Sequence, residues 1–432
     1  QSVGEYVQGM LLWTGSLIDF KDFGNTLKDG TNEMGISFDI KDLKILTRSL
    51  LAVDQIVDVH VEVKLMRRDD NPDYECLKSL LIVVNGQKYK ISSPDGQKAR
   101  LIVGKADSQN LGDDVILGST NSFLPPLFFK TKGQNSEEES EKAYREMKKF
   151  FSEDGRSTLF QRSVIRTLHY IFDRGKLKEQ ISKSRYINVK NTDEEVFQNL
   201  LQYYAVNILI DSINFYLIQL AGNIQYIKPL RAIVERYYRY TNISVNEISA
   251  DGSNLPSYYN SLKKTKFDLL NRWLESSFGF TVKLVPLEGH MELQIKQKET
   301  NVRNLVDVGF GYTQILPILT ILWKIIWDDD TEKRNVRRLC KTHIVAIEQP
   351  ELHLHPRFQG MFATMLARLI YDGRQQGIDL RILVETHSEV IINRLGELIA
   401  DANESLQSED VNVLIFNGKS EGLEKEVSDL CG

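Results

Sequence analysis

Residues 341–389 read KTHIVAIEQPELHLHPRFQGMFATMLARLIYDGRQQGIDLRILVETHSE, and this stretch decides the fold of the chain. It opens on an apolar run, residues 344–347, that ends in Glu348. Four apolar residues closed by a carboxylate predict a buried β-strand with an acid at its C-terminal end. In open α/β sheets, ligands bind beyond the carboxyl ends of the strands. Glu348 is therefore a candidate for a functional site.

The rest of the stretch predicts a helix and a second strand. Apolar residues recur at helical intervals of three and four: Phe358, Met361, Phe362, Met365, Leu366 and Leu369. Gly373 and Gly377 interrupt the pattern, and a second apolar run, residues 382–384, leads into Glu385, Thr386 and His387. Strand, helix and strand in this length form a parallel crossover. We therefore expect Glu348 and His387 at the same edge of one sheet.

An acid and a histidine in these places resemble the Walker B carboxylate and the switch histidine of ABC-type ATPases. The sequence EQPELHLHP followed by ETHSE resembles the OLD-type branch of these ATPases, also called AAA15 or AAA21. Residues 306–317, VDVGFGYTQILP, resemble the signature loop of that branch, and residues 224–238, IQYIKPLRAIVERYY, resemble a YxxPxR segment of related ATPases. The resemblance implies an α/β, P-loop NTPase-like ABC-type fold with an antiparallel β lobe and a helical insertion.

The resemblance also assigns catalytic roles, with ATP and Mg²⁺ as the cofactors. Glu348 stands at the Walker B position, where a carboxylate holds the metal directly or through water. His387 corresponds to the histidine that contacts the γ-phosphate. The alternative is a structural histidine whose hydrogen bonds are made within the sheet edge. Gln349 stands where most ABC-type ATPases carry a glutamate that polarises the attacking water. A glutamine cannot take up a proton, so either hydrolysis is slow or Glu351 or His387 assists.

The signature-like loop implies a site shared between two protomers. In the family this loop closes over ATP bound to the partner, which assigns nucleotide contacts to Gly309, Gly311, Thr313 and Gln314. Glycines allow a close backbone approach, and a helix N-terminus favours anions. An ordinary glycine-rich turn is the alternative. The resemblance therefore implies a homodimer or a higher homo-oligomer.

The loop after the Walker B strand faces the other protomer in the family, which assigns further contacts to Glu351 and His355. Another interpretation makes His353 and His355 zinc ligands together with His343. That reading requires a third ligand to converge on the pair at an open site.

A P-loop is missing from the given residues. Its pattern, GxxxxGK[ST], lets backbone N–H groups wrap a phosphate while the lysine reaches it. The only Gly-Lys-Ser, at residues 418–420, has Val413 where the first glycine is required. We expect the P-loop to lie upstream of Gln1, because in the family it precedes a segment that resembles residues 1–25. The alternative is a chain that binds a triphosphate poorly.

Composition limits the cellular setting. The net charge of −5 gives no global basic footprint for nucleic acid, which leaves nucleic-acid binding undecided. Cys76, Cys340 and Cys431 form no metal motif and are typical of reduced thiols in a cytoplasmic protein. The longest apolar stretch, residues 315–327, contains Lys324 and is too short for a bilayer, so no membrane partner is expected.

The chain divides into three predicted parts. Residues 1–132 alternate as β-strands and form the β-rich part of the ATPase lobe, with a hairpin turn at Asn85-Gly86. Residues 133–222 form a helical insertion with helices at 157–174 and 193–221. Residues 223–432 form the C-terminal ATPase core. Within it we expect a turn at 251–252, a helix at 267–278, a hairpin at 281–297 and a strand at 411–416.

The resemblance implies a sensor or scaffold in prokaryotic anti-phage defence. Too little sequence follows residue 395 for the TOPRIM nuclease domain of OLD nucleases, so we expect a separate effector. The short insertion resembles the ATPase subunit of the PARIS system, which holds a TOPRIM nuclease and responds to a phage-encoded trigger. The ATPase of Septu-type systems, paired with an HNH nuclease, is the second choice. Two alternatives remain open: a RecF-like repair ATPase on duplex DNA, and a non-hydrolysing structural module.

Overall fold

The computed structural model describes residues 27, 31–45, 56–67, 75–93, 98–103, 115–117, 124, 127–129, 179, 194–229, 231–232, 234–240, 244–297, 301–328, 340–401, 406–419 and 422–428. The chain forms two units, Gln1–Ile218 and Gln219–Gly432. This division falls near the predicted border at residues 222 and 223. The helix predicted at 157–174 lies outside the described residues.

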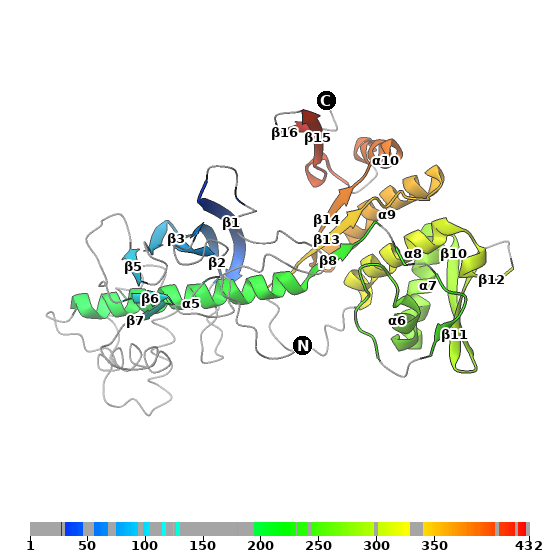
Figure 1. Ribbon diagram of the computed structural model, residues 1–432, viewed down its shortest axis with the longest axis horizontal. Helices are drawn as coiled ribbons and strands as arrows, with labels where there is room; N and C mark the ends of the chain where they lie inside the picture. The colour runs from blue at the N-terminus through cyan, green and yellow to red at the C-terminus, as the bar shows by residue number, and fades with distance from the viewer. Residues whose placement is uncertain are drawn as a thin grey trace. The chain divides into compact units, whose positions relative to one another are not determined.

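The first unit contains a seven-stranded antiparallel sheet in chain order (Figure 1). Its strands are β1 Glu33–Lys44, β2 Ile56–Arg67, β3 Glu75–Val84, β4 Gln87–Ser92, β5 Lys98–Val103, β6 Val115–Leu117 and β7 Leu127–Phe129. Asn85 and Gly86 join β3 to β4 with φ of 49° and 74°, as a tight type I′ hairpin requires. The alternation of buried and outward residues along β2 and β3 confirms the predicted strands.

Helix α5 spans Glu194–Gly222 and confirms the helix predicted at 193–221. Its residues Ala205, Val206, Ile208, Leu209, Ile210 and Ile213 are buried in one hydrophobic cluster with the inward side chains of β1 to β5. Burial of this apolar face stabilises the first unit, since each buried side chain of this size contributes about 1.5–3 kcal/mol.

The second unit is built on a parallel three-stranded sheet in the order β14-β13-β8. The strands are β8 Ile224–Ile227, β13 Thr342–Glu348 and β14 Asp379–Glu385. Helix α9, Pro356–Gln375, makes the crossover from β13 to β14 and packs against β14 and against α10, Glu389–Ala400 (Figure 1). The predicted strand–helix–strand crossover is confirmed. All three strands therefore end at one edge.

The second unit also contains a long apolar helix, α8, and several shorter elements. In chain order these are β9 Tyr238–Arg239, α6 Leu255–Ser261, α7 Lys264–Phe278, β10 Phe280–Leu287, β11 His290–Gln297, β12 Arg303–Asn304, η2 Leu305–Asp307, α8 Phe310–Trp323, η3 Lys324–Asp328, η4 Ser408–Asp410, β15 Val413–Lys419 and β16 Gly422–Ser428. The predicted helix at 267–278 and hairpin at 281–297 are confirmed as α7 and the β10–β11 pair. The strand predicted at 411–416 begins two residues later, as β15.

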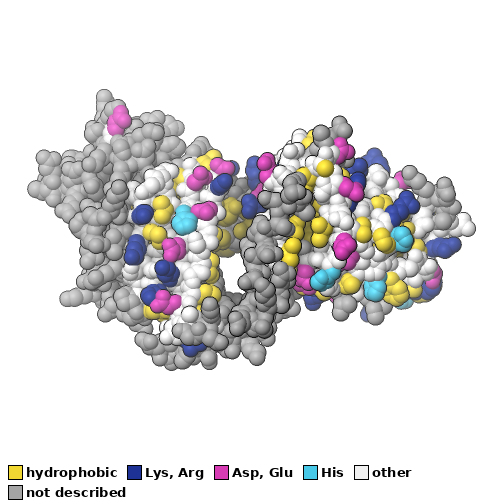
Figure 2. Space-filling model, turned by 90° about the horizontal axis from the view of Figure 1, so that it is seen from above, with side chains coloured by type: hydrophobic (Ala, Val, Ile, Leu, Met, Phe, Trp, Pro, Cys, Tyr) yellow, Lys and Arg dark blue, Asp and Glu magenta, His cyan; other side chains and the backbone are white. Residues whose placement is uncertain are grey.

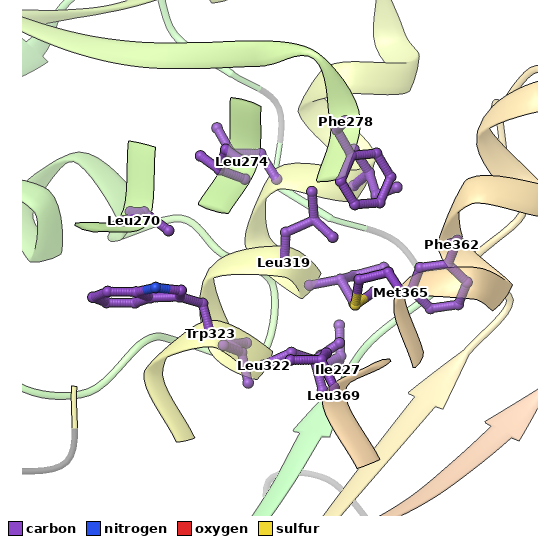
Figure 3. Close-up of a cluster of buried hydrophobic side chains, with 14 of the residues drawn as sticks. Ile227, Leu270, Leu274, Phe278, Leu319, Leu322, Trp323, Phe362, Met365 and Leu369 are labelled. Atoms are coloured by element: carbon purple, nitrogen blue, oxygen red, sulfur yellow. The ribbon is translucent and has the colours of Figure 1, made fainter. Parts of the chain in front are cut away.

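Helix α8 runs through the core of the second unit. Leu319, Leu322 and Trp323 pack against Leu270 and Leu274 of α7 and against Phe362, Met365 and Leu369 of α9 (Figure 3). Residues 313–323 are all buried, so this helix shows no polar face. That burial explains why the helix is apolar on every side.

Among the described residues, Ala205–Gly222 and Phe310–Asp328 have the length and composition of a membrane-crossing helix. Core helices of soluble proteins share this length and composition. Burial within α8 accounts for the second stretch.

Candidate functional site

The carboxyl edge of the parallel sheet gathers the predicted catalytic residues. Glu348 ends β13 and pairs in register with Glu385, which ends β14. Neighbouring parallel strands in register turn paired side chains to the same face, so two carboxylates share this edge. His387 lies two residues past Glu385 and is exposed. The predicted juxtaposition of Glu348 and His387 at one edge is therefore what the structure shows.

Glu348 receives a hydrogen bond from the neighbouring strand. The hydroxyl of Tyr226, on β8, donates to Oε1 of Glu348 over 2.7 Å. This hydrogen bond, with burial and the charges of Glu348 and Glu385, raises the pKa of Tyr226 to about 12. Tyr226 therefore remains a proton donor at neutral pH and fixes one carboxylate oxygen of Glu348. The other oxygen, Oε2, has no hydrogen-bond partner within the described part of the chain.

Arg231 ties the backbone after β13 to the segment after β8. Its Nη1 donates to the carbonyl oxygens of Pro229 at 2.8 Å and Gln349 at 3.3 Å, and its Nη2 donates to that of Glu348 at 3.2 Å. The side chain is only 6% exposed, and desolvation lowers its pKa to about 10 despite the nearby charge of Glu351. The guanidinium is still charged at neutral pH. It holds the backbone of Glu348 and Gln349 in place.

Gln349 begins a strained turn. Its φ is 42°, in the left-handed region that non-glycine residues seldom adopt, and its N–H donates to the carbonyl of Glu385 over 2.8 Å. His353, four residues on, has a φ of 61°. Residues in such conformations cost about 1–3 kcal/mol each and cluster at functional sites. Arg231 supplies part of the contact energy that holds this turn.

Glu351 connects the loop after β13 to the loop after β14. Its Oε2 accepts a hydrogen bond from the hydroxyl of Thr386 at 2.7 Å, and its Oε1 accepts one from the backbone N–H of His387 at 2.8 Å. Both carboxylate oxygens therefore position the segment that carries His387. The imidazole of His387 makes no hydrogen bond to any described residue, which leaves it free to contact a ligand.

The start of α10 is fixed to the start of α9. Ser388 caps α10 by accepting a hydrogen bond from the N–H of Ile391 at 3.2 Å, and its hydroxyl donates to Oε1 of Gln359 at 2.6 Å. Gln359 in turn donates to the carbonyl of Leu354 at 2.9 Å. The loop that bears His387 is thus held from both sides.

The signature-like loop forms the N-terminus of α8. Gly309 is the N-cap residue, with φ 98° and ψ 156°, a conformation that is essentially restricted to glycine. Its neighbour Phe310 is 74% exposed. Thr313 and Gln314 lie one turn further in and are each 9% exposed, and the hydroxyl of Thr313 donates to the carbonyl of Phe310 over 2.7 Å. Within residues 309–314, the exposed residues are therefore Gly309 and Phe310.

This loop contacts the turn after β13 within the same chain. The rings of Phe310 and His353 lie 5.9 Å apart. A Cβ added to Gly311 would lie 3.4 Å from the carbonyl oxygen of His353 and 3.6 Å from Leu354 Cδ2. The structure thus brings the predicted loop beside the loop that follows Glu348.

The predicted zinc set is not brought together among the described residues. His343 is buried within β13, at the strand end opposite Glu348, whereas His355 caps α9 by accepting a hydrogen bond from the N–H of Arg357 at 3.2 Å. No cluster of three or more His, Cys, Asp or Glu side chains that could hold a metal is found in the described part of the chain.

The YxxPxR segment resembles one in related ATPases, but no functional role for its residues was predicted from the sequence. Its Tyr226 and Arg231 are the two side chains that fix Glu348. The motif itself was the available signal. Its link to Glu348 could not be inferred from the sequence because the residues are separated by 122 and 117 positions.

Comparison with known proteins identifies the class. The family model described as AAA_15, AAA ATPase domain, matches residues 17–392. A search of the curated proteins found no match. The family match confirms the predicted ATPase class and its α/β fold. The OLD-type branch and the PARIS-like subgroup stay predictions.

Solved structures of SMC ATPases are similar at low identity. A Smc head domain with an extended coiled coil, bound to the C-terminal domain of ScpA, from Pyrococcus furiosus, is 7% identical with a TM-score of 0.26, over 87% of this chain and 79% of that one. A Smc head domain with a coiled coil and joint from Pyrococcus yayanosii is 9% identical with a TM-score of 0.26, over 87% of this chain and 84% of that one.

Proposed function

This chain belongs to the AAA_15 family of AAA ATPase domains, and we propose that it is a slow ATPase whose nucleotide sites are shared between copies of the chain. The observation that carries the proposal is that Glu348 and His387 share one sheet edge, with the N-terminus of α8 beside the loop that follows Glu348. We further propose that ATP-driven assembly of these copies controls a separate effector in the cytoplasm.

The sheet edge fits a magnesium–nucleotide. Carboxylate oxygens are preferred Mg²⁺ ligands, and Oε2 of Glu348 has no other described partner. When bound, Mg²⁺ neutralises charge on the β- and γ-phosphates. Tyr226 keeps Glu348 oriented, and the exposed imidazole of His387 is placed to donate a hydrogen bond to a phosphate oxygen. Glu351 keeps His387 in place by holding its backbone N–H.

Slow turnover follows from Gln349. Its side chain can orient a water through its amide but cannot accept the proton that the water loses. Its backbone is already fixed by Arg231 and by the carbonyl of Glu385. The left-handed φ and these contacts fix the backbone from which the side chain projects. Slow hydrolysis gives the ATP-bound assembly a long life, which suits a switch better than a motor.

The N-terminus of α8 is the proposed contact with the nucleotide of another copy. The first N–H groups of a helix have no partner within the helix and favour anions. Gly309 leaves its backbone accessible, since nothing lies within 4 Å of a Cβ placed there. Phe310 beside His353 adds an exposed ring pair that a second protomer can cover.

The proposed role in anti-phage defence rests on the sequences of the motifs. EQPELHLHP and ETHSE resemble OLD-type ATPases that act with a separate nuclease, of the TOPRIM kind in PARIS and the HNH kind in Septu. Co-purification of this chain with a nuclease encoded beside it, together with phage plating in cells that carry both genes, tests that role. Unchanged plating efficiency with and without the pair would contradict it.

The ATPase proposal is tested by variants at the sheet edge in the full-length protein. Glu348→Ala should reduce ATP turnover by at least 100-fold, because the metal loses its carboxylate. Gln349→Glu should raise turnover, because a carboxylate can take up the proton of the attacking water. Glu288→Ala, an exposed acid in the β10–β11 turn, is the matched control and should leave turnover unchanged. Full activity in Glu348→Ala would refute the assignment.

A further inference from the structure

A cleft of about 380 Å³ lies between α9, α10 and the C-terminal end of α7. Three arginines line it: Arg357 and Arg368 of α9 and Arg394 of α10. Two hydroxyl groups, of Ser277 and Thr364, complete its polar lining. The nucleotide site proposed above uses none of these five side chains.

The cleft is cationic within an acidic chain. Neither Asp nor Glu lines it, although the whole chain carries a net charge of −5. Among the described residues, no carboxylate forms an ion pair with Arg357 or Arg368. Asp372 experiences the charge of Arg368 but burial still raises the pKa of that carboxyl group. On the face drawn in Figure 2, described Lys and Arg side chains are interspersed with Asp and Glu, whereas the charged side chains that line the cleft are all arginines.

Arg394 is fixed in position over α9. Its Nε donates to the hydroxyl of Thr364 at 3.0 Å, and its Nη1 donates to Oε2 of Glu397 at 2.7 Å. The pair with Glu397 is exposed and therefore weak. Nε and Nη1 thus anchor the side chain, and Nη2 makes no hydrogen bond to a described residue.

The three cations are spread along a line. Arg357, Thr364 and Arg368 stand at positions i, i+7 and i+11 of α9, which lie on one face of a helix. Eleven residues of helix span about 16 Å. Arg394 is bonded to Thr364 and so lies between the other two. Three guanidinium groups carried along the helix in this way suit a polymer with a regular series of anions.

We propose that this cleft binds the sugar–phosphate backbone of a nucleic acid. Guanidinium groups form forked hydrogen bonds to phosphate oxygens. The 16 Å span corresponds to about five nucleotide steps of one strand, at ~3.4 Å each. No aromatic side chain lines the cleft, so it has no platform for stacking bases. Contacts of this kind position a nucleic acid without reading its sequence.

This inference is independent of ATP hydrolysis, so it is tested without nucleotide. The probe is a fluorescent 30-base-pair DNA duplex of mixed sequence, titrated with the full-length protein at 50 mM salt while anisotropy is followed. The double change Arg357→Gln with Arg368→Gln should weaken binding at least tenfold. For the wild type, a plot of log affinity against log salt concentration should have a slope near −3. In the double variant the slope should fall in magnitude by about 2, one unit for each lost phosphate contact.

Arg272→Gln provides the matched control, because Arg272 is an exposed arginine of α7 that does not line the cleft. It should bind DNA like the wild type. Arg357→Lys with Arg368→Lys should keep the salt slope and lose affinity only modestly. Thermal melting of each variant checks that the fold is intact.

Three results would overturn the proposal. The first is no binding by the wild type at micromolar concentration in 50 mM salt. The second is an equal loss of affinity in Arg272→Gln and in the double variant. The third is a competition result. If poly-glutamate displaces the labelled DNA at the same concentration of negative charge as unlabelled duplex does, the cleft is assigned to an acidic protein.

Discussion

At the scale of single residues, the hydrogen bond from Tyr226 to Glu348 makes a prediction about pH. The pKa of Tyr226 in the folded chain is raised to about 12, above its ordinary value of 10. The unfolded chain therefore loses this proton first as the pH rises. The stabilisation from the bond is fully present below pH 10 and is lost between pH 10 and pH 12.

Tyr226→Phe should lower the free energy of unfolding by about 1.5–3 kcal/mol at pH 8, as for a hydrogen bond to a charged group. The difference from the wild type should shrink above pH 10. Denaturant unfolding followed by circular dichroism at several pH values measures both effects. Tyr371→Phe, at an exposed tyrosine of α9, is the control and should not change stability. Identical unfolding of Tyr226→Phe and wild type at pH 8 would show that the bond contributes nothing.

The residues of the edge were predictable to different degrees. Glu348 and His387 could be placed together because a parallel crossover leaves little choice of geometry. The left-handed φ of Gln349 and the buried guanidinium of Arg231 could not be predicted from the sequence, because both depend on contacts between distant parts of the chain. Thr313 and Gln314 were expected at the nucleotide, and the structure buries their side chains in α8. Their role remains a prediction.

At the scale of elements, the start of α8 depends on Gly309. Its φ of 98° and ψ of 156° belong to a region that an L side chain reaches only at a cost of about 1–3 kcal/mol. Gly309→Ala should therefore destabilise the second unit and displace the exposed loop. ATP turnover should fall with it, because the N–H groups of the loop would no longer point at the phosphates.

The control for Gly309 is Gly289→Ala in the β10–β11 turn. Gly289 also has a positive φ, 70°, and nothing lies within 4 Å of a Cβ placed there. Both variants should melt at a lower temperature, and only Gly309→Ala should lose ATPase activity. Equal activity of the two variants would separate the loop from catalysis.

The elements themselves were largely predictable. Alternation predicted β2, the β3–β4 hairpin and the β10–β11 hairpin, because each has one buried face. The sequence of helix α8 shows only an apolar run. A helix that is buried on every side has no amphipathic periodicity from which its first and last residues could be predicted. The structure places its start at Phe310, five residues before the apolar run at 315–327.

At the scale of the whole molecule, the shared-site proposal predicts assembly driven by ATP. A ligand that binds at an interface stabilises the assembled state. Gly311→Arg places a bulky cation on the loop, and Glu348→Ala removes the metal ligand, so each variant alone should be inactive. Mixed in equal amounts, the two variants can form one site from an intact loop and an intact Glu348. Partial ATPase activity should return.

Sedimentation velocity of the full-length wild type, with and without ATP, provides the companion measurement. The sedimentation coefficient should rise with ATP. The fold of Gly311→Arg is checked by melting, because the Cβ contacts at that position are only moderately tight, at 3.4 and 3.6 Å. A strict monomer at micromolar concentration under both conditions would refute the shared site.

The long-range bonds of Arg231 and Tyr226 have a consequence for synthesis of the chain. These side chains are made 117 and 122 residues before the backbone and carboxylate of Glu348 that they hold. At about 5–20 residues per second, roughly 6–24 seconds pass before β13 reaches them. During that interval the guanidinium of Arg231 has no burial site, and the sheet edge does not exist. A nascent chain thus forms this sheet edge late, once β13 and β14 have emerged from the ribosome.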